Sequence, residues 1–222
     1  AVDADPAGLS NDRAWVFHGA LDQTVGKKVS EATLALYQTF LPPESTVFID
    51  DVEAAHLFPS PGEGTDCTSS ASPWVGACGY DGAGELLSFL YPGLMPPDET
   101  QRQSAAELEV VSLPAGGRTG LADEALVFRP SACPPEGCRL HLVLHGCLQS
   151  REQLGDEFAI LSGYLPWAEV NGIVLAFPQV KPQPSNPLGC WDWWGYSGDN
   201  FLLRDGPQML ALVNWLESLL GP

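Results

Sequence analysis

Short apolar runs that are typical of β-strands alternate with helical segments along this chain, and this alternation limits the fold more than any other feature. Strands are expected over Arg13–Gly19, Ser45–Val52, Glu107–Pro114, Glu124–Cys133, Cys138–Gly146 and Gly172–Gln179. Strands that alternate with helices predict an α/β fold with a mostly parallel sheet and helices on both faces. Such sheets bind ligands at the carboxyl ends of their strands.

Helical spacing marks the segments between these strands. Val29, Ala32, Leu36 and Phe40 recur on one helix face before Pro42-Pro43, and residues 82–93 form a short helix closed by proline and glycine. The segment from Arg151 begins as a helix that Pro166 should break. The last helix places a set of apolar residues on one face: Met209, Leu212, Val213, Leu216, Leu219 and Leu220. The segment that holds Cys67 and Cys78 is expected to be a long loop rich in glycine, serine and proline.

Length and composition indicate one domain over residues 1–222. The chain is 222 residues long and 45% hydrophobic, which is enough to bury a full core. Its formal net charge of −18 argues against nucleic acid or an anionic membrane surface as a partner, because nothing basic could replace the counterions. No stretch approaches the roughly 20 apolar residues of a membrane span.

Two predicted strand ends carry groups that could act together. Asp22 follows the strand that ends at Gly19, His56 follows the strand that ends at Val52, and one helix separates them. In a parallel sheet the two strands would be neighbours, about 5 Å apart. A carboxylate that orients an imidazole is two-thirds of a nucleophilic triad, so Asp22 and His56 are the candidate catalytic pair.

A third strand ends in His145-Gly146-Cys147, where glycine allows close approach to the backbone. Acyl transfer needs backbone N–H donors aimed at the developing oxyanion, and the N–H of Cys147 is the candidate donor. The alternative is Cys147 as a nucleophile. His141 and His145 are not a predicted metal pair, because four residues on a strand span about 13 Å, too far for one ion. No metal or cofactor is expected.

A glycine-rich stretch holds three tryptophans, Trp191, Trp193 and Trp194. Such a cluster either packs a core or lines a surface for a ligand. Because it lies beside a loop and outside periodic structure, contact with substrate is the favoured interpretation.

Six cysteines suggest three disulfides by closeness or motif, although six cysteines allow 15 pairings. The candidate pairs are Cys67 with Cys78, Cys133 with Cys138, and Cys147 with Cys190. Disulfides indicate an exported protein, secreted or periplasmic. The alternative is six free thiols in a cytosolic protein.

Several of these motifs together resemble those of a known family. "LHLVLHGCLQ", "IVLAFPQV" and "NPLGCWDWWGY", with "FHGALDQTV" and "DVEAAHLFP" upstream, are similar to the polyhydroxybutyrate depolymerase esterases of the circularly permuted α/β-hydrolase group. The resemblance runs from about Arg13 to the C-terminus. It implies that Asp22 is the triad acid, His56 the triad base and Cys147 the oxyanion donor. It also places Trp191, Trp193 and Trp194 near the substrate, a short-chain poly(3-hydroxyalkanoate) or its oligomers.

The chain departs from this family in having no Gly-x-Ser-x-Gly nucleophile elbow. Ser197 lacks the final glycine of that motif, and Ser162 lacks the first. In the permuted group the elbow precedes the acid loop, so the serine and its strand are expected upstream of Ala1. A pseudoenzyme is the alternative, but truncation also explains why the chain starts without methionine.

Two other functions stay open from the sequence alone. One is an esterase that removes feruloyl or acetyl groups from carbohydrate. The other is a non-catalytic module that binds a polymer or ligand through its tryptophans.

Overall fold

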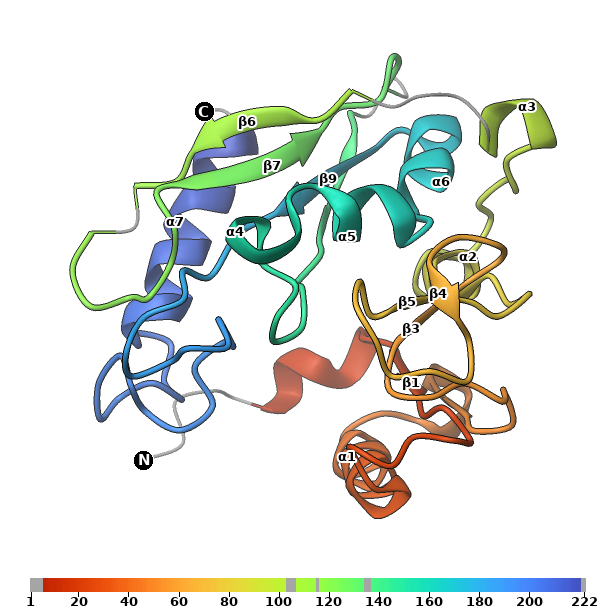
Figure 1. The fold of residues 1–222 in the computed structure, drawn as a ribbon, viewed down its shortest axis with the longest axis horizontal. Coiled ribbons are helices and arrows are strands. Elements are labelled where there is room, and N and C mark those ends of the chain that lie inside the picture. Colours follow the sequence, from red (N-terminus) through yellow and green to blue (C-terminus); the bar gives the residue numbers. More distant parts are fainter. Residues whose placement is uncertain (1–5, 103–106, 115, 134–136, 221–222) are drawn as a thin grey trace. The chain divides into compact units, whose positions relative to one another are not determined.

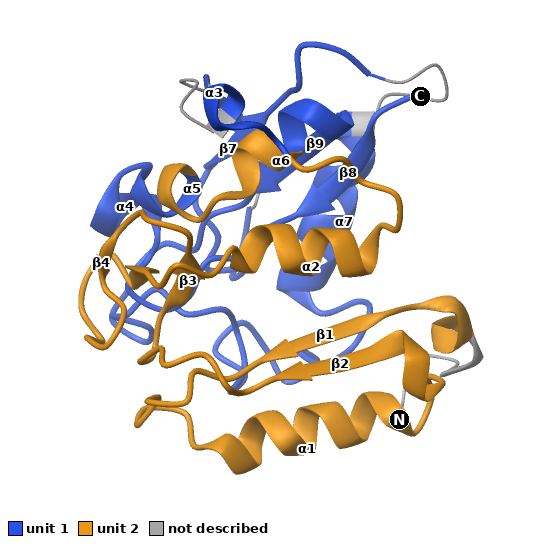
Figure 2. Cartoon of the chain, turned by 90° about the vertical axis from the view of Figure 1, so that its right-hand side faces the viewer, with its two compact units in different colours: residues 1–3, 97–159, 168–222 blue, residues 4–96, 160–167 orange. Residues whose placement is uncertain are grey.

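The computed structural model describes residues 6–102, 107–114, 116–133 and 137–220. These residues form two compact units, drawn in different colours in Figure 2. Unit 1 comprises residues 1–3, 97–159 and 168–222, and unit 2 comprises residues 4–96 and 160–167. The prediction of a single domain over residues 1–222 stays a prediction.

Figure 1 labels most of the helices and strands. In unit 2 and up to residue 102 they are η1 (Pro6–Asn11), β1 (Ala14–Phe17), α1 (Lys27–Gln38), η2 (Pro43–Ser45), β2 (Thr46–Ile49), β3 (Phe58–Ser60), β4 (Thr65–Asp66), β5 (Val75–Ala77), α2 (Gly82–Leu90) and α3 (Glu99–Arg102). The remainder are β6 (Glu109–Ser112), β7 (Glu124–Phe128), β8 (Arg139–Leu142), α4 (Arg151–Leu154), α5 (Glu157–Leu161), α6 (Tyr164–Asn171), β9 (Ile173–Phe177) and α7 (Pro207–Leu220).

Unit 2 contains two small parallel sheets. β1 pairs with β2 in parallel, with Ala14 opposite Thr46 and Phe17 opposite Ile49, and α1 makes the crossover between them. Figure 2 shows α1 and α2 on opposite sides of this strand pair. The second sheet has the order β3-β5-β4 and is also parallel. Each strand here is short, so the loops that follow carry much of the pairing between segments.

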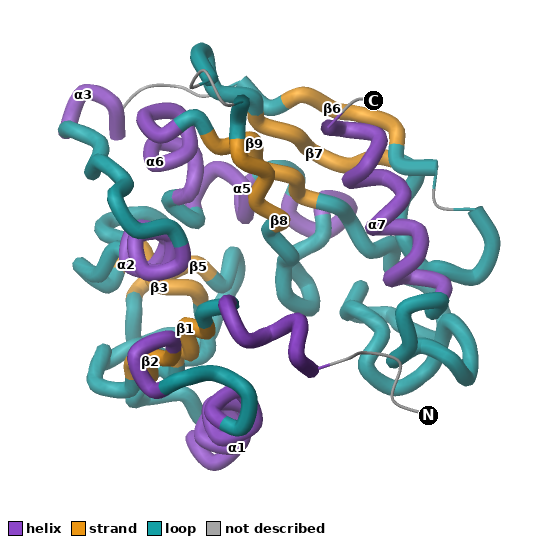
Figure 3. The backbone as a smooth tube through the Cα atoms, turned by 180° about the vertical axis from the view of Figure 1, so that it is seen from behind, coloured by secondary structure: helices purple, strands orange, loops and turns teal. Residues whose placement is uncertain are grey.

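Unit 1 is built on the four-stranded sheet β6-β7-β9-β8. Val127, Ala176 and Leu113 on one face pack against Leu212 and Trp215 of α7, forming a buried core. Figure 3 shows α7 in front of this sheet, and Figure 1, from the opposite side, shows α4 in front of it. Helices therefore cover both faces, as the sequence predicts.

The α/β class is confirmed, but the prediction of one mostly parallel sheet needs correction. The described residues form three sheets, and the largest is mixed: β6 with β7 and β7 with β9 are antiparallel, and only β8 with β9 is parallel. The connections account for part of the difference. A link through the Gly116-Gly117 turn joins the antiparallel β6 and β7, whereas α4 to α6 supply the crossover that the parallel β8–β9 pair requires.

Three local predictions also differ from the structure. Pro166 does not break a helix, because it lies in the first turn of α6, where a backbone N–H needs no helical partner. The loop that holds Cys67 and Cys78 contains β3, β4 and β5. The predicted apolar face of α1 is exposed, with Val29 at 59% and Leu36 at 60%.

The apolar face predicted for the last helix is only partly buried. Leu212 is buried, and Leu216 and Leu219 pack against the core, but Met209 and Val213 are exposed. Trp215, which the predicted face does not include, is buried instead.

Candidate functional site

The loops that follow β1 and β2 remain hydrogen-bonded to each other beyond the strands. The N–H of His18 donates to Ile49 O, that of Ala20 to Val52 O, and that of Leu21 to Ala54 O. Gly19 makes this approach possible, because a Cβ there would lie 2.2 Å from Ala54 O. The paired loops carry Asp22 and His56 to the same place.

Asp22 and His56 form the contact expected from the sequence. Asp22 Oδ2 lies 2.8 Å from His56 Nδ1, while Oδ1 accepts the N–H groups of Thr24 (2.7 Å) and Val25 (2.9 Å). Burial on its own would raise the pKa of Asp22, but the hydrogen bonds from His56 and from the two backbone N–H groups hold it below the ordinary 3.8. Asp22 is therefore an anion in place to hold the Nδ1–H tautomer of His56.

The other ring nitrogen of His56 is available. The imidazole side chain is 43% exposed, against 9% for Asp22. Within residues 6–102, 107–114, 116–133 and 137–220, no hydrogen-bond partner approaches His56 Nε2. The backbone around it is fixed, since His56 N–H donates to Ser70 Oγ at 3.0 Å and Ala55 N–H donates to Cys67 O at 2.8 Å. These contacts leave an oriented imidazole with one free nitrogen.

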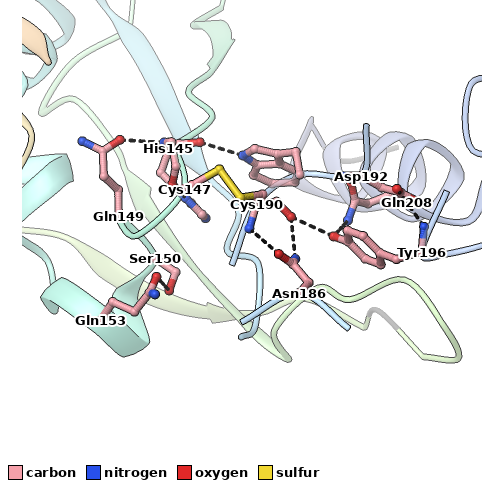
Figure 4. Close-up of a disulfide and its surroundings, with 12 residues drawn as sticks. His145, Cys147, Gln149, Ser150, Gln153, Asn186, Cys190, Asp192, Tyr196 and Gln208 are labelled. Carbon is pink, nitrogen blue, oxygen red and sulfur yellow. Dashed lines mark hydrogen bonds between the residues drawn. A yellow bond between two sulfur atoms is a disulfide. The ribbon is translucent and has the colours of Figure 1, made fainter. Parts of the chain in front are cut away.

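The second set of candidate residues lies in unit 1, in the turn after β8 (Figure 4). Gly146 N–H donates to Gln149 Oε1 at 2.6 Å, and Leu148 N–H donates to Leu188 O at 2.7 Å. Leu148 has a φ of 66°, a conformation that residues other than glycine seldom adopt. Between these bonded groups, the exposed Cys147 has an N–H with no acceptor among the described residues. The turn therefore presents one unused backbone donor.

The three tryptophans lie in different environments. Trp193 is 73% exposed and Trp194 is also exposed. Trp191 is half-buried, its indole N–H donates to His145 O at 2.8 Å, and its ring lies against that of His145. Trp191 therefore supports the turn, and Trp193 and Trp194 face solvent.

Asp192 holds the backbone of the aromatic loop, residues 189–201. Its Oδ1 accepts N–H groups of Gly195 (2.7 Å) and Tyr196 (3.0 Å), and its Oδ2 accepts the N–H of Ser197 (2.8 Å). Burial would raise the pKa of Asp192, but these bonds and that from the Ser197 hydroxyl hold it below 3.8. The loop therefore closes around a half-buried carboxylate.

All three cysteine pairs named from the sequence are bonded. They are Cys67–Cys78, Cys133–Cys138 and Cys147–Cys190. The last one ties the Cys147 turn to the aromatic loop, with the two Cα atoms 4.3 Å apart. Since Cys147 is bonded, it is not a free nucleophile in this structure. Three disulfides are typical of proteins from oxidising compartments.

Several other candidates have no catalytic geometry. Ser162 and Ser197 are buried, and Ser197 Oγ donates to Asp192. His141 lies on β8, and desolvation lowers its pKa to about 4. No group of three or more side chains able to hold a metal ion occurs in the described part of the chain. Over the same residues, no helix has the length and hydropathy to cross a membrane.

Sequence reasoning missed Ser70, Gln149 and Asp192. Asp192 precedes a glycine-rich turn, where aspartate commonly accepts local backbone N–H groups, so it carried a usable signal. Gln149 lies two residues after Cys147 but gives no signal of its own. Ser70 is one of several serines in its loop, and only the folded structure distinguishes it.

An imidazole oriented by a carboxylate, and a backbone N–H without an acceptor, are groups that acyl-transfer enzymes of the α/β class use. Comparisons with known proteins narrow this class. No family model matches the chain. It is 32% identical over 212 residues to a poly(3-hydroxybutyrate) depolymerase of Delftia acidovorans, covering 94% of this chain and 42% of that protein. It is 31% identical over 234 residues to a polyhydroxybutyrate depolymerase of Talaromyces funiculosus, covering 98% of this chain and 69% of that protein.

Solved structures point to the same family. A depolymerase crystal structure from Penicillium funiculosum has a TM-score of 0.86 at 31% identity over 96% of this chain and 72% of that chain. A serine-to-alanine variant of a PHB depolymerase complexed with R3HB trimer has a TM-score of 0.87 at 30% identity, with the same coverage. The chain belongs to the polyhydroxybutyrate depolymerase family. It spans less than half the length of the Delftia relative.

Proposed function

We propose that this chain is the C-terminal part of a secreted or periplasmic serine esterase that hydrolyses short-chain poly(3-hydroxyalkanoates) or their oligomers. The observation that carries the proposal is the 2.8 Å contact between Asp22 and His56, with His56 Nε2 left without a partner. The family, the three disulfides and a relative complexed with R3HB trimer support it.

The proposed mechanism is acyl transfer to serine and then to water. His56 Nε2 takes the serine proton as the hydroxyl attacks the ester carbonyl, while Asp22 stabilises the imidazolium. The N–H of Cys147 donates to the oxyanion of the tetrahedral intermediate. When the carbonyl re-forms, His56 returns the proton to the leaving alcohol, and water repeats the sequence to free the acid. Trp191, Trp193 and Trp194 form the aromatic segment that contacts the substrate.

We place the serine upstream of Ala1, on a strand and elbow that complete a circularly permuted α/β-hydrolase fold. Two observations support this placement. Ser162 and Ser197 are buried, and β1–β2 is a sheet of only two strands in the described residues. Two-stranded sheets are marginally stable alone, so a further strand would complete this one.

The test uses the protein extended to include the segment encoded before Ala1. We expect saturable hydrolysis of a 3-hydroxybutyrate trimer, blocked by an organophosphate that modifies serine. Hydrolysis of feruloyl or acetyl carbohydrate esters with no action on the trimer would replace the proposed substrate.

The exposure of Trp193 favours a second function, a polymer-binding module. Polymer adsorption without hydrolysis of any ester would replace the esterase with that module.

A further inference from the structure

The peptide group between Gly146 and Cys147 is held from its carbonyl side. Gly146 O lies 2.7 Å from His145 Nδ1 and accepts the N–H of Gln149 at 3.2 Å. In a trans peptide the N–H points opposite to the C=O. Fixing the carbonyl of Gly146 therefore fixes the direction of the N–H of Cys147, the donor without an acceptor.

The hydrogen bonds of His145 define a single tautomer. Its Nε2 accepts the N–H of Val180 at 3.1 Å, so Nε2 carries no proton. The proton is on Nδ1, which donates to Gly146 O. Burial lowers the pKa of His145, although the bond to Gly146 O acts in the opposite direction, so the ring is neutral near pH 7.

His145 is not placed to react with a substrate. It is only 3% exposed, and both ring nitrogens are engaged with the backbone. Its own carbonyl accepts the indole N–H of Trp191, whose ring is tilted by 44° against the imidazole with the two centroids 5.3 Å apart. Strand β9 leads into Val180 through Phe177, so the ring connects the end of one strand to the turn after its neighbour.

We propose that His145 is a positioning residue, whose neutral Nδ1–H tautomer turns the Gly146–Cys147 peptide so that the Cys147 N–H faces the oxyanion. The inference rests on the proposed function, because it assigns that N–H its catalytic role. It adds a residue that acts through the backbone and does not touch the substrate.

Two substitutions separate the two bonds of His145. In His145→Asn, the amide nitrogen occupies the place of Nδ1 and can still donate to Gly146 O, but nothing accepts from Val180. In His145→Gln, the amide oxygen occupies the place of Nε2 and can accept from Val180, but the donor at Nδ1 is lost. Both remove the imidazole, so each controls for the other in packing.

The kinetic test uses the extended protein and the 3-hydroxybutyrate trimer, with active enzyme counted by organophosphate titration. Loss of an oxyanion donor lowers kcat by about 10²–10³. A donor that points in the wrong direction keeps part of its effect, so His145→Gln should lower kcat about 10- to 100-fold. KM should change less than about threefold, and His145→Asn should keep kcat within about fivefold of the parent, since the donor to Gly146 O is retained. Equal kcat losses in both variants would overturn the inference.

A second measurement does not depend on activity. Long-range ¹H–¹⁵N correlation spectra of the 222-residue chain report which nitrogen of His145 carries the proton. We expect Nδ1–H at pH 7, and an Nε2–H or charged ring would overturn the inference. Failure of the parent enzyme to cleave the trimer would instead count against the proposed function, whatever the spectrum shows.

Discussion

At the scale of single residues, the Asp22 carboxylate has two tasks, since one oxygen fixes its own loop and the other orients His56. In Asp22→Asn the amide nitrogen would donate to His56 Nδ1 and force the proton onto Nε2, which could then no longer accept one. We expect kcat for trimer hydrolysis to fall by about 10⁴ in the extended protein.

The control for this prediction is Asp51→Asn, which changes an exposed carboxylate on the loop after β2. Its kcat should stay within about twofold of the parent, because exposed substitutions away from the site have little effect. If Asp22→Asn keeps parental kcat, Asp22 is not the triad acid.

The lowered pKa of Asp192 predicts that acid destabilises the aromatic loop. Its pKa is lowered in the folded state, so it stabilises the fold above pH 3.8 and loses that contribution as pH falls below 3.8. Asp192→Asn leaves the N–H and hydroxyl of Ser197 without their acceptor, which should cost about 1–3 kcal/mol of unfolding free energy.

Urea unfolding at pH 7 measures this loss, and the tryptophan fluorescence of the parent should change between pH 4 and pH 2. Asp199→Asn, in the same loop but exposed, should retain the parental unfolding free energy. Equal unfolding free energies for the two variants would show that Asp192 does not stabilise the loop.

At the scale of elements, the β1 and β2 loops depend on the close contact between Gly19 and Ala54 O. The Cβ of Gly19→Ala would lie 2.2 Å from that oxygen, so the loops must separate and the Asp22–His56 contact must lengthen. We expect a loss of about 1–3 kcal/mol in unfolding free energy, as for other overpacked sites, and a lower kcat.

Gly26→Ala is the matched control. Gly26 precedes α1 at a φ of −63°, and a Cβ there meets no atom within 4 Å. This variant should keep both stability and kcat. The prediction for Gly19 fails if its alanine variant behaves like that of Gly26.

The elements show which parts of the fold were predictable. Long apolar runs such as Ile173–Phe177 and the pattern of the β1–α1–β2 segment gave the correct element types, and the strand ends gave the Asp22–His56 pair. β3, β4 and β5 have two or three residues each, and include Pro59 and Gly76, so no periodic pattern marks them. They form because of long-range pairing and the Cys67–Cys78 disulfide.

Sequence periodicity also gave no sign of which apolar face would be covered. The spacing of Val29 and Leu36 predicted a buried face of α1, yet both are exposed. Periodicity describes how residues lie on one helix, but burial depends on what packs against it. Similarly, the tautomer of His145 depends on the bonds to Gly146 O and from Val180 N–H, and only the folded structure shows these bonds.

For the whole molecule, the proposal of an upstream serine strand predicts how the 222-residue chain behaves alone. Without its nucleophile a triad enzyme loses about 10⁶ in kcat, so this chain should show no measurable hydrolysis of the trimer. Its two-stranded β1–β2 sheet has outer edges unpaired in the described residues, whereas β7 and β9 each have two neighbours.

Amide hydrogen exchange shows whether the 222-residue chain lacks only the serine side chain or a whole strand of the β1–β2 sheet. In the 222-residue chain, amides of β1 and β2 should exchange faster than those of β7 and β9, because a two-stranded sheet is marginally stable. In the extended protein the added strand should slow exchange in β1–β2 and restore hydrolysis together. If activity returns while β1–β2 exchange stays unchanged, the serine segment does not complete this sheet. If the 222-residue chain cleaves the trimer at ordinary enzymatic rates, the nucleophile lies within it, and the upstream serine must be abandoned.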